Sequence, residues 1–270
     1  MSDALGTYAK ILRAHLVHQD SGGEAIVYID RHIVHTDTSA QAFDGLRLAH
    51  RDVRRPEATF APHTDAPAGN PVRAKLLDTL DGNAHEYHLA RFETGELADG
   101  IAQPGMTLCG AREDISAFGA IGAVCFISDA GDCEHALATQ TLRRMPAPVM
   151  YIDIPPAFAA QTPETLLAAL VQQAGLPVLR AHVLELGGSG IAVMDMETRL
   201  RLSSLLFGIA PFGAVIAPDD KTIDWLKGKP HAPSGRDWAF ACEYWESLRA
   251  DGNAAYDAKI TLGDHAARSA

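Results

Sequence analysis

The chain has 270 residues, of which 47% are hydrophobic and 21% are charged, a composition typical of soluble globular proteins. Its formal net charge of -11 argues against binding to nucleic acid, because phosphate backbones require clustered Lys and Arg. There is no apolar run of about 18 residues that would span a membrane and no secretion signal at the start, so we expect a cytoplasmic protein.

The N-terminal part of the chain alternates between helical and strand patterns. An apolar stripe at helical spacing predicts a helix over 7–18, and the continuous apolar run 25–29 predicts a strand buried on both faces. A second helix is expected to start near Ser39. The segment 56–83 is rich in Pro, Gly, Asp and Asn and is predicted to be mostly loop, with a short helical patch near 74–80.

The C-terminal part continues this alternation. Thr162 and Pro163 combine a helix cap with a first-turn proline, which predicts a helix that runs to Gln173. Further helices are expected at 134–142, 196–207 and 237–249, and strands at 147–154, 183–186 and 214–216. Strands that alternate with helices predict a layered α/β architecture.

Several segments carry distinctive sequence signatures. They are 28–35 (YIDRHIVH), 38–47 (TSAQAFDGLR), 53–56 (VRRP), 104–107 (PGMT), 134–142 (EHALATQTL), 216–219 (IAPD) and 227–233 (KGKPHAP). In order and approximate spacing, these segments are similar to the large subunit of 3-isopropylmalate dehydratase, a member of the aconitase superfamily. The similarity extends from about Tyr8 to Leu262.

The resemblance implies a three-layer α/β/α fold of the aconitase type, made of the first two intertwined domains only. The third domain, which supplies the iron–sulfur ligands in that family, has no counterpart in the 270 residues. We therefore expect one truncated aconitase-like unit over 1–270, with approximate sub-parts 1–145 and 146–262 and a tail at 263–270. Loss of a domain exposes apolar surface, which predicts a homo-oligomer or a partner subunit.

The segments that correspond to the chemical motifs of the family are altered. The family's Asp-His motif corresponds to Pro62-His63-Thr64-Asp65-Ala66, and its Gly-Asp-Ser-His-Thr motif falls on Ala111-Arg112-Glu113-Asp114-Ile115. The four cysteines, Cys109, Cys125, Cys133 and Cys242, form no C-x-x-C pair and lack the spacing of a cluster site. Because a [4Fe–4S] cluster needs thiolate ligands, we expect the cluster to be absent and no other cofactor, with a divalent metal as the one alternative.

Acids and histidines reappear at these altered positions. The candidates for proton transfer are His63, Asp65, Glu113 and Asp114. His63 and Asp65 lie on one side of an extended segment, because side chains alternate along a strand. His85 and His88 are three residues apart, and together with His63 they could bind a divalent metal. The alternative is that these histidines are solvated and have no function.

The retained segments supply the candidates for substrate binding. The resemblance implies that Gln41 contacts the substrate. Arg31, His35 and Arg112 could bind a carboxylate, since an arginine donates to both oxygens. Arg31 and His35 could instead be structural hydrogen-bond partners, and Arg112 could neutralise its acidic neighbours. The glycine-rich turn 187–190 lacks the Gly-Lys-Ser/Thr of a phosphate loop and is interpreted as structural.

Three functions remain open. The first is a repurposed enzyme that performs lyase or isomerase chemistry on a small malate-like carboxylate without a cluster. The second is a non-catalytic binding or regulatory subunit, and the third is a large-subunit part of a 3-isopropylmalate dehydratase that other chains complete. The reappearance of acids and histidines favours the first.

Overall fold

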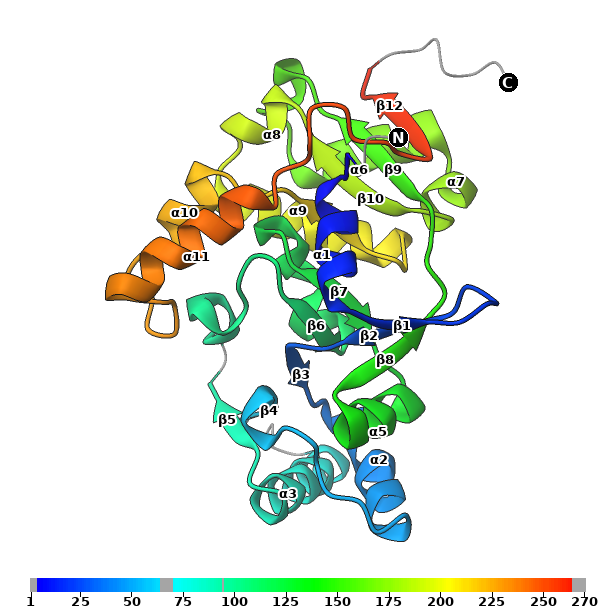
Figure 1. The fold of residues 1–270 in the computed structure, drawn as a ribbon, viewed down its shortest axis with the longest axis vertical. Helices are drawn as coiled ribbons and strands as arrows, with labels where there is room; N and C mark the ends of the chain where they lie inside the picture. Colours follow the sequence, from blue (N-terminus) through cyan, green and yellow to red (C-terminus); the bar gives the residue numbers. More distant parts are fainter. Residues whose placement is uncertain (1–3, 64–69, 94, 264–270) are drawn as a thin grey trace.

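The computed structural model describes residues 4–63, 70–93 and 95–263, and its fold is of the α/β class (Figure 1). In this described part the strands form two parallel sheets and one three-stranded antiparallel sheet. No helix among the described residues is long and apolar enough to cross a membrane.

The first parallel sheet has the strand order β5-β4-β3-β6-β7. Its strands are β3 (Arg31–Ile33), β4 (Thr59–Pro62), β5 (Ala90–Phe92), β6 (Thr107–Gly110) and β7 (Val124–Ile127). Within this sheet the chain forms the central strand β3 first. It then adds β4 and β5 on one side of β3, and afterwards β6 and β7 on the other side. The strand order therefore reverses between β3 and β6, which is where open α/β sheets bind ligands.

The helices α2 (Thr36–Leu48), α3 (Pro71–Glu86) and α5 (Ala130–Thr139) pack together next to this sheet, at the lower end of Figure 1. Phe43, Leu80 and Leu137 are among the buried side chains of their shared core. Ala61 from β4 joins the same core, whereas Ile33 and Phe92 join a second core on the opposite face of the sheet.

The second parallel sheet has the strand order β11-β10-β9-β12 and lies in the upper part of Figure 1. Its strands are β9 (Val149–Asp153), β10 (Val183–Gly187), β11 (Ala214–Ile216) and β12 (Ala258–Thr261). Its helices are α6 (Pro163–Ala174), α7 (Leu176–Arg180), α8 (Ser189–Val193), α9 (Met196–Ile209), α10 (Asp220–Leu226) and α11 (Gly235–Ser247). The predicted start of α6 is confirmed, because the Thr162 side chain accepts a hydrogen bond from the Thr165 amide and Pro163 is the first helical residue.

Helix α9 joins the cores of the two parallel sheets. Met196 and Phe207 are buried in the core that contains Ile33, whereas Leu202 and Leu206 are buried in the core of the second sheet. The neighbouring 3-10 segment Ser116–Ile121 approaches β11 so closely that a Cβ atom on Gly119 would lie 1.8 Å from the Ala214 carbonyl oxygen. Only glycine allows this close contact. It lies between the two halves of the fold, by which we mean the first parallel sheet with its helices and the second parallel sheet with its helices.

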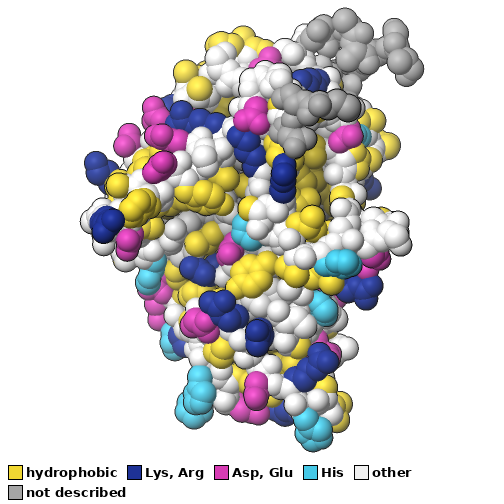
Figure 2. Space-filling view, in the orientation of Figure 1, with side chains coloured by type: hydrophobic (Ala, Val, Ile, Leu, Met, Phe, Trp, Pro, Cys, Tyr) yellow, Lys and Arg dark blue, Asp and Glu magenta, His cyan; other side chains and the backbone are white. Residues whose placement is uncertain are grey.

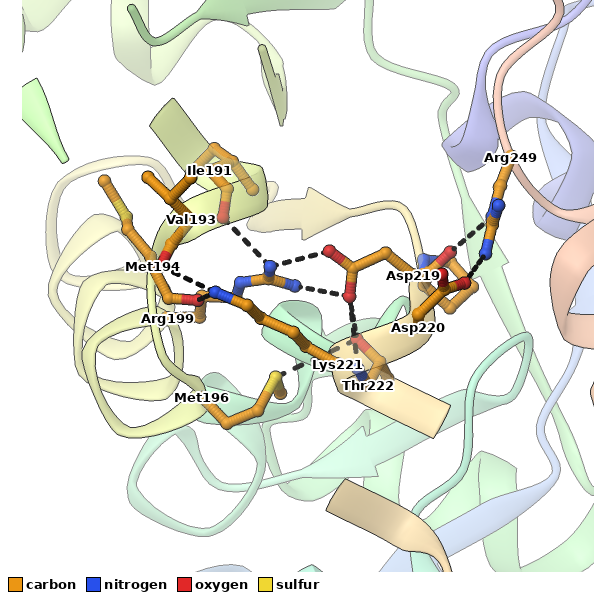
Figure 3. Close-up of polar contacts among 11 residues, drawn as sticks. Ile191, Val193, Met194, Met196, Arg199, Asp219, Asp220, Lys221, Thr222 and Arg249 are labelled. Atoms are coloured by element: carbon orange, nitrogen blue, oxygen red, sulfur yellow. Dashed lines mark hydrogen bonds and ion pairs between the residues drawn. The ribbon is translucent and has the colours of Figure 1, made fainter. Parts of the chain in front are cut away.

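The buried Arg199 organises the helices at the end of the second sheet (Figure 3). The Arg199 side chain is fully buried. Its guanidinium donates to both oxygens of Asp219, at 2.9 and 2.6 Å, and to the Ile191 carbonyl oxygen at 2.9 Å. Asp219 also caps α10 by accepting a hydrogen bond from the Thr222 amide. The Arg199 side chain thus ties α9 to α10 through the ion pair and to α8 through the hydrogen bond.

The first helix is shorter than the predicted 7–18, because its last residues belong to the antiparallel sheet. Helix α1 spans Thr7–His15, and the following residues form β1 (Leu16–Gln19), which pairs with β2 (Ala25–Tyr28), while β8 (Thr141–Arg144) pairs with the other edge of β2. The helical apolar pattern continued past His15, but pairing with β2 determines the conformation of the next residues. Tertiary pairing therefore overrides the local pattern here.

Three other predicted boundaries were wrong for local reasons. Helix α3 has 16 residues where mostly loop was predicted. The Asn70 side chain caps its start, and the helix lacked a strong apolar pattern because only a narrow stripe of it is buried. Helix α2 starts at Thr36 rather than near Ser39, since the His35 ring accepts a hydrogen bond from the Asp37 amide. Helix α5 ends at Thr139 because Gln140 adopts a left-handed conformation with φ of 59°.

His15 ends α1 in an ion pair that makes stability depend on pH. Its Nε2 lies 2.7 Å from Asp30 Oδ2 and its Nδ1 lies 2.8 Å from the Ile11 carbonyl oxygen, so only the charged ring donates at both positions. Burial alone lowers the His15 pKa, but the hydrogen bond and charge of Asp30 outweigh it and the pKa is raised.

We therefore expect the contribution of His15 to stability to be complete below about pH 6.5 and to decline as the pH rises through the higher pKa of the folded state. Thermal unfolding measured at intervals from pH 5.5 to 9 should show this decline in the wild type, and a His15→Gln variant should lack it. An identical pH profile for both proteins would contradict the assignment.

Candidate functional site

A cavity of about 250 Å³ lies at the carboxyl ends of the strands where the order of the first sheet reverses. Its polar lining comes from His35 and Thr36 after β3, from Arg73 of α3 and from Asp114 of the short helix Arg112–Ile115 after β6. Phe92 and Phe118 are among its apolar lining residues. Because these segments are distant in the sequence, only the strand order brings them together.

Arg73 is held at one end of its guanidinium. Its Nη1 donates to Thr36 Oγ1 at 2.7 Å and to Asp37 Oδ1 at 3.3 Å. Its Nε and Nη2 make no hydrogen bond with any described residue, and 33% of the side chain is exposed. The fixed end orients the group, and the other two donors can bind an anion in the cavity.

His35 and Asp114 supply the groups that can exchange protons. His35 Nδ1 accepts a hydrogen bond from the Asp37 amide at 3.3 Å, and the His35 side chain is only 13% exposed. Both restrict the ring to a narrow range of positions. Asp114 is half-buried, and its Oδ2 is shielded from solvent. An imidazole, a carboxylate and a guanidinium in one cavity are suited to acid/base chemistry on an anionic molecule.

The structure places the other predicted site residues away from this cavity or leaves them undescribed. Arg31 lies at the amino end of β3, where it donates to the Asp30 carbonyl oxygen at 2.9 Å and packs over the Phe60 ring. Gln41 and Arg112 are exposed, on α2 and on the helix after β6. Asp65 lies outside the described residues, and the side chain of Glu113 is likewise not described.

His63, His85 and His88 surround a separate, open hollow of about 390 Å³ between β5 and α3. His63 Nδ1 lies 3.2 Å from Arg91 Nη2, and Arg91 also pairs with Asp81. Pro62 lines the first cavity while His63 lines this hollow, because neighbouring side chains of a strand point to opposite faces. Within 4–63, 70–93 and 95–263, no three His, Cys, Asp or Glu side chains are arranged to hold a metal ion.

The cysteines of this chain do not fit a [4Fe–4S] cluster at the cavity. All four are described, they belong to four different apolar cores, and none of them lines the cavity. Burial raises the pKa of the Cys109 thiol to about 12 and also raises the pKa of Cys125 and Cys133. Cluster ligation requires converging thiolates, which these side chains do not provide.

The glycine-rich turn after β10 is closely packed. A Cβ on Gly190 would lie 2.5 Å from the carbonyl oxygens of Ile154 and Pro155, and one on Gly188 would lie 2.1 Å from Asp153 Oδ1. These glycines let the turn approach the end of β9, which agrees with the structural interpretation from the sequence.

The sequence reasoning missed Arg73 and Thr36 as lining residues. Arg73 lay in a segment predicted to be mostly loop, although Asn70 and Pro71 together are a helix-start signal. Thr36 lies just after the end of β3, separated from Ile33 by Val34 and His35, and the end of a strand in a parallel sheet is a common position for a ligand-binding residue.

Comparison with known proteins identifies the family of this chain. The model of the aconitase family (aconitate hydratase) matches residues 9–266. The chain therefore belongs to the aconitase family. Among solved structures it is similar to aconitase X of Thermococcus kodakaraensis in its holo-form, with 10% sequence identity and a TM-score of 0.45. The match covers 88% of this chain and 57% of that chain, so this chain spans little more than half the length of that relative.

Proposed function

We propose that the cavity between β3 and β6 binds a small carboxylate metabolite and performs lyase or isomerase chemistry on it without an iron–sulfur cluster. The observation that carries this proposal is the position of Arg73, whose Nε and Nη2 are not bonded to described residues, in the same cavity as Asp114 and His35. The family assignment supports a hydro-lyase-like scaffold.

In this proposal each side chain has one role. Arg73 binds the substrate carboxylate and so fixes the carbon next to it. Asp114 in its ionised form removes the proton from that carbon. The His35 ring, whose Nδ1 accepts the Asp37 amide hydrogen bond and whose proton is therefore on Nε2, donates that Nε2 proton to the leaving hydroxyl. One C–H and one C–O bond break, a C=C bond forms and one water leaves. General acid/base groups of this kind accelerate such steps by about 10² to 10⁴.

The finer features of the proposal come from the resemblance to the large subunit of 3-isopropylmalate dehydratase. They are a malate-like substrate, a division near 145 and 146, and a cytoplasmic location. The proton-transfer roles of His63, Asp65 and Glu113 and the binding roles of Gln41, Arg31 and Arg112 stay separate predictions, because those of them that the structure describes do not line this cavity. A metal held by His63, His85 and His88 is the weakest part, because no metal-binding arrangement is found among the described residues.

A second candidate is a non-catalytic subunit, or a large-subunit part that another chain completes. Helix α11 favours it, because Phe240 is 56% exposed and Tyr244 is 43% exposed on the same helix. Figure 2 shows hydrophobic side chains gathered in the region of this helix. Exposed aromatic surface of this kind is often covered by a protein partner.

A thermal-shift screen with malate, citrate and other hydroxy and dicarboxylic acids tests the binding part of the proposal. At a concentration of about 100 Kd, a ligand that binds only the folded state adds about 2.7 kcal/mol and raises Tm by roughly 5–10 °C. Arg73→Ala should abolish this shift, because it removes the carboxylate-binding donors.

Arg91→Ala is the matched control, since it removes the same charge beside the other hollow. It should keep the full ligand-induced shift, whatever its effect on the unliganded Tm. Equal shifts in wild type and Arg73→Ala, or no shift with any acid, would refute carboxylate binding at this cavity.

A further inference from the structure

A second cavity, of about 220 Å³, lies between the two halves of the fold and is mostly apolar. Its wall includes Tyr8 and Leu12 of α1, Val27 of β2, Phe126 of β7, and Ala147 and Phe212 from the second half of the chain. None of the residues that line the carboxylate cavity contributes to it. An apolar cavity of about 150 Å³ is large enough to bind benzene, so this one has room for a six-membered ring with a substituent.

Tyr8 brings a hydroxyl group to this mostly apolar cavity. The residue is 6% exposed, and its hydroxyl makes no hydrogen bond with any described residue. The hydroxyl oxygen is nevertheless not sealed from solvent, since it is not among the fully enclosed unbonded polar atoms. Water can therefore reach the hydroxyl. A ligand with a matching polar group replaces the hydrogen bond to water, whereas a ligand without one leaves the hydroxyl unpaired in the filled cavity.

The charged residues at the cavity are already paired. Arg144 donates from Nη1 and Nη2 to the two oxygens of Asp132, at 2.9 and 2.7 Å, and also to the carbonyl oxygens of Arg143 and Ile127. A charged ligand would have to displace one of these partners. Cys125 is also among the lining residues, but its thiol donates to the Ile115 carbonyl oxygen at 3.2 Å in the neighbouring core, and burial raises its pKa, so it is a poor nucleophile.

The rim of the cavity is accessible. Met145 is 60% exposed and Phe212 is 46% exposed, so these two lining residues lie at the surface. Met145 directly follows β8 of the antiparallel sheet and Phe212 precedes β11 of the second parallel sheet, so an occupant would contact segments next to both sheets.

We propose that this cavity is a binding site for a small uncharged ring compound, with one hydroxyl or carbonyl group hydrogen-bonded to the Tyr8 hydroxyl. The apolar wall selects the ring, the paired Arg144 and Asp132 disfavour charge, and Tyr8 selects one polar substituent. This site is independent of the carboxylate cavity and of any reaction there.

Phenol, toluene and benzoate are suitable probes, followed by ligand-observed NMR and calorimetric titration of the full chain. Phenol should bind the wild type more tightly than toluene, and benzoate should bind least. Tyr8→Phe keeps the ring but removes the hydroxyl, so phenol affinity should fall by about three- to tenfold while toluene affinity stays unchanged.

Ala147→Trp should abolish binding of both phenol and toluene by filling the cavity from its partly exposed side. Phe212→Ala removes a partly exposed side chain of the cavity wall without adding volume to the core, and it should lower the affinity for both phenol and toluene. This variant tests the site if the Ala147→Trp variant fails to fold. The proposal is overturned if neither phenol nor toluene binds, if Ala147→Trp folds and still binds phenol, or if Phe212→Ala leaves both affinities unchanged. Equal loss of phenol and toluene in Tyr8→Phe, or benzoate binding as tightly as phenol, would also overturn it.

Discussion

Replacement of Asp219 by alanine should destabilise the protein by about 3 kcal/mol, because it leaves the fully buried Arg199 guanidinium without its counter-ion (Figure 3). This value lies at the low end for a buried ion pair, since 30% of the Asp219 side chain is exposed. The α10 cap would be lost with it. For a chain of this size the expected fall in Tm is roughly 6–12 °C, measured by circular dichroism or calorimetry.

Glu164→Ala is the matched control. Glu164 pairs at 3.0 Å with Arg201, which is on the same helix as Arg199, but both side chains are more than half exposed. Exposed pairs contribute little, so the Tm should hardly change. Equal destabilisation by the two variants would mean that burial of Arg199 is not the cause.

The Asp219 pair should also make the protein sensitive to acid. Burial raises the Asp219 pKa, but the hydrogen bonds and charge of Arg199 outweigh it, so the pKa of the folded state lies below the ordinary value. The contribution is therefore present above about pH 4 and lost as the pH falls through the lower pKa of the folded state. Asp219→Ala should accordingly lose less Tm than the wild type between pH 5 and 3.

Asp114→Asn is the change that we expect to have the largest effect on activity. Under the proposed function it removes the base while it preserves the size of the side chain, so turnover of an accepted acid should fall by about 10² to 10⁴. The thermal shift with the same acid should persist, because Arg73 still binds the carboxylate. The measurement is a steady-state assay of double-bond formation by ultraviolet absorbance, together with the thermal shift.

Asp44→Asn is the control for this experiment, since Asp44 is exposed on α2 and paired with Arg47 away from the cavity. It should leave turnover unchanged. A thermal shift without measurable turnover in the wild type would favour the non-catalytic subunit. Full turnover in Asp114→Asn would instead show that Asp114 is not the base.

The sequence by itself determined features that depend on neighbouring residues or on long distinctive segments. The Thr162-Pro163 helix start and the apolar run at 183–186 specify α6 and β10 locally, and the structure agrees with both. The retained motifs predicted an aconitase relative, which the family match over 9–266 confirms. Caps and buried runs are local interactions, so they can be predicted without knowledge of the chain path.

Only the tertiary structure decided which polar residues meet. His63 and Asp114 were predicted as one proton-transfer group, yet the described structure places them at different cavities, while Arg73 joins Asp114 and His35. The physical reason is that the order of strands in the sheet determines which strand ends are adjacent, and the two-residue repeat of a strand determines which face each side chain takes. Pairing between distant segments determines the order of the strands and the faces of their side chains, and pairing with β2 also ends α1 at His15. No local pattern of residues encodes such pairing.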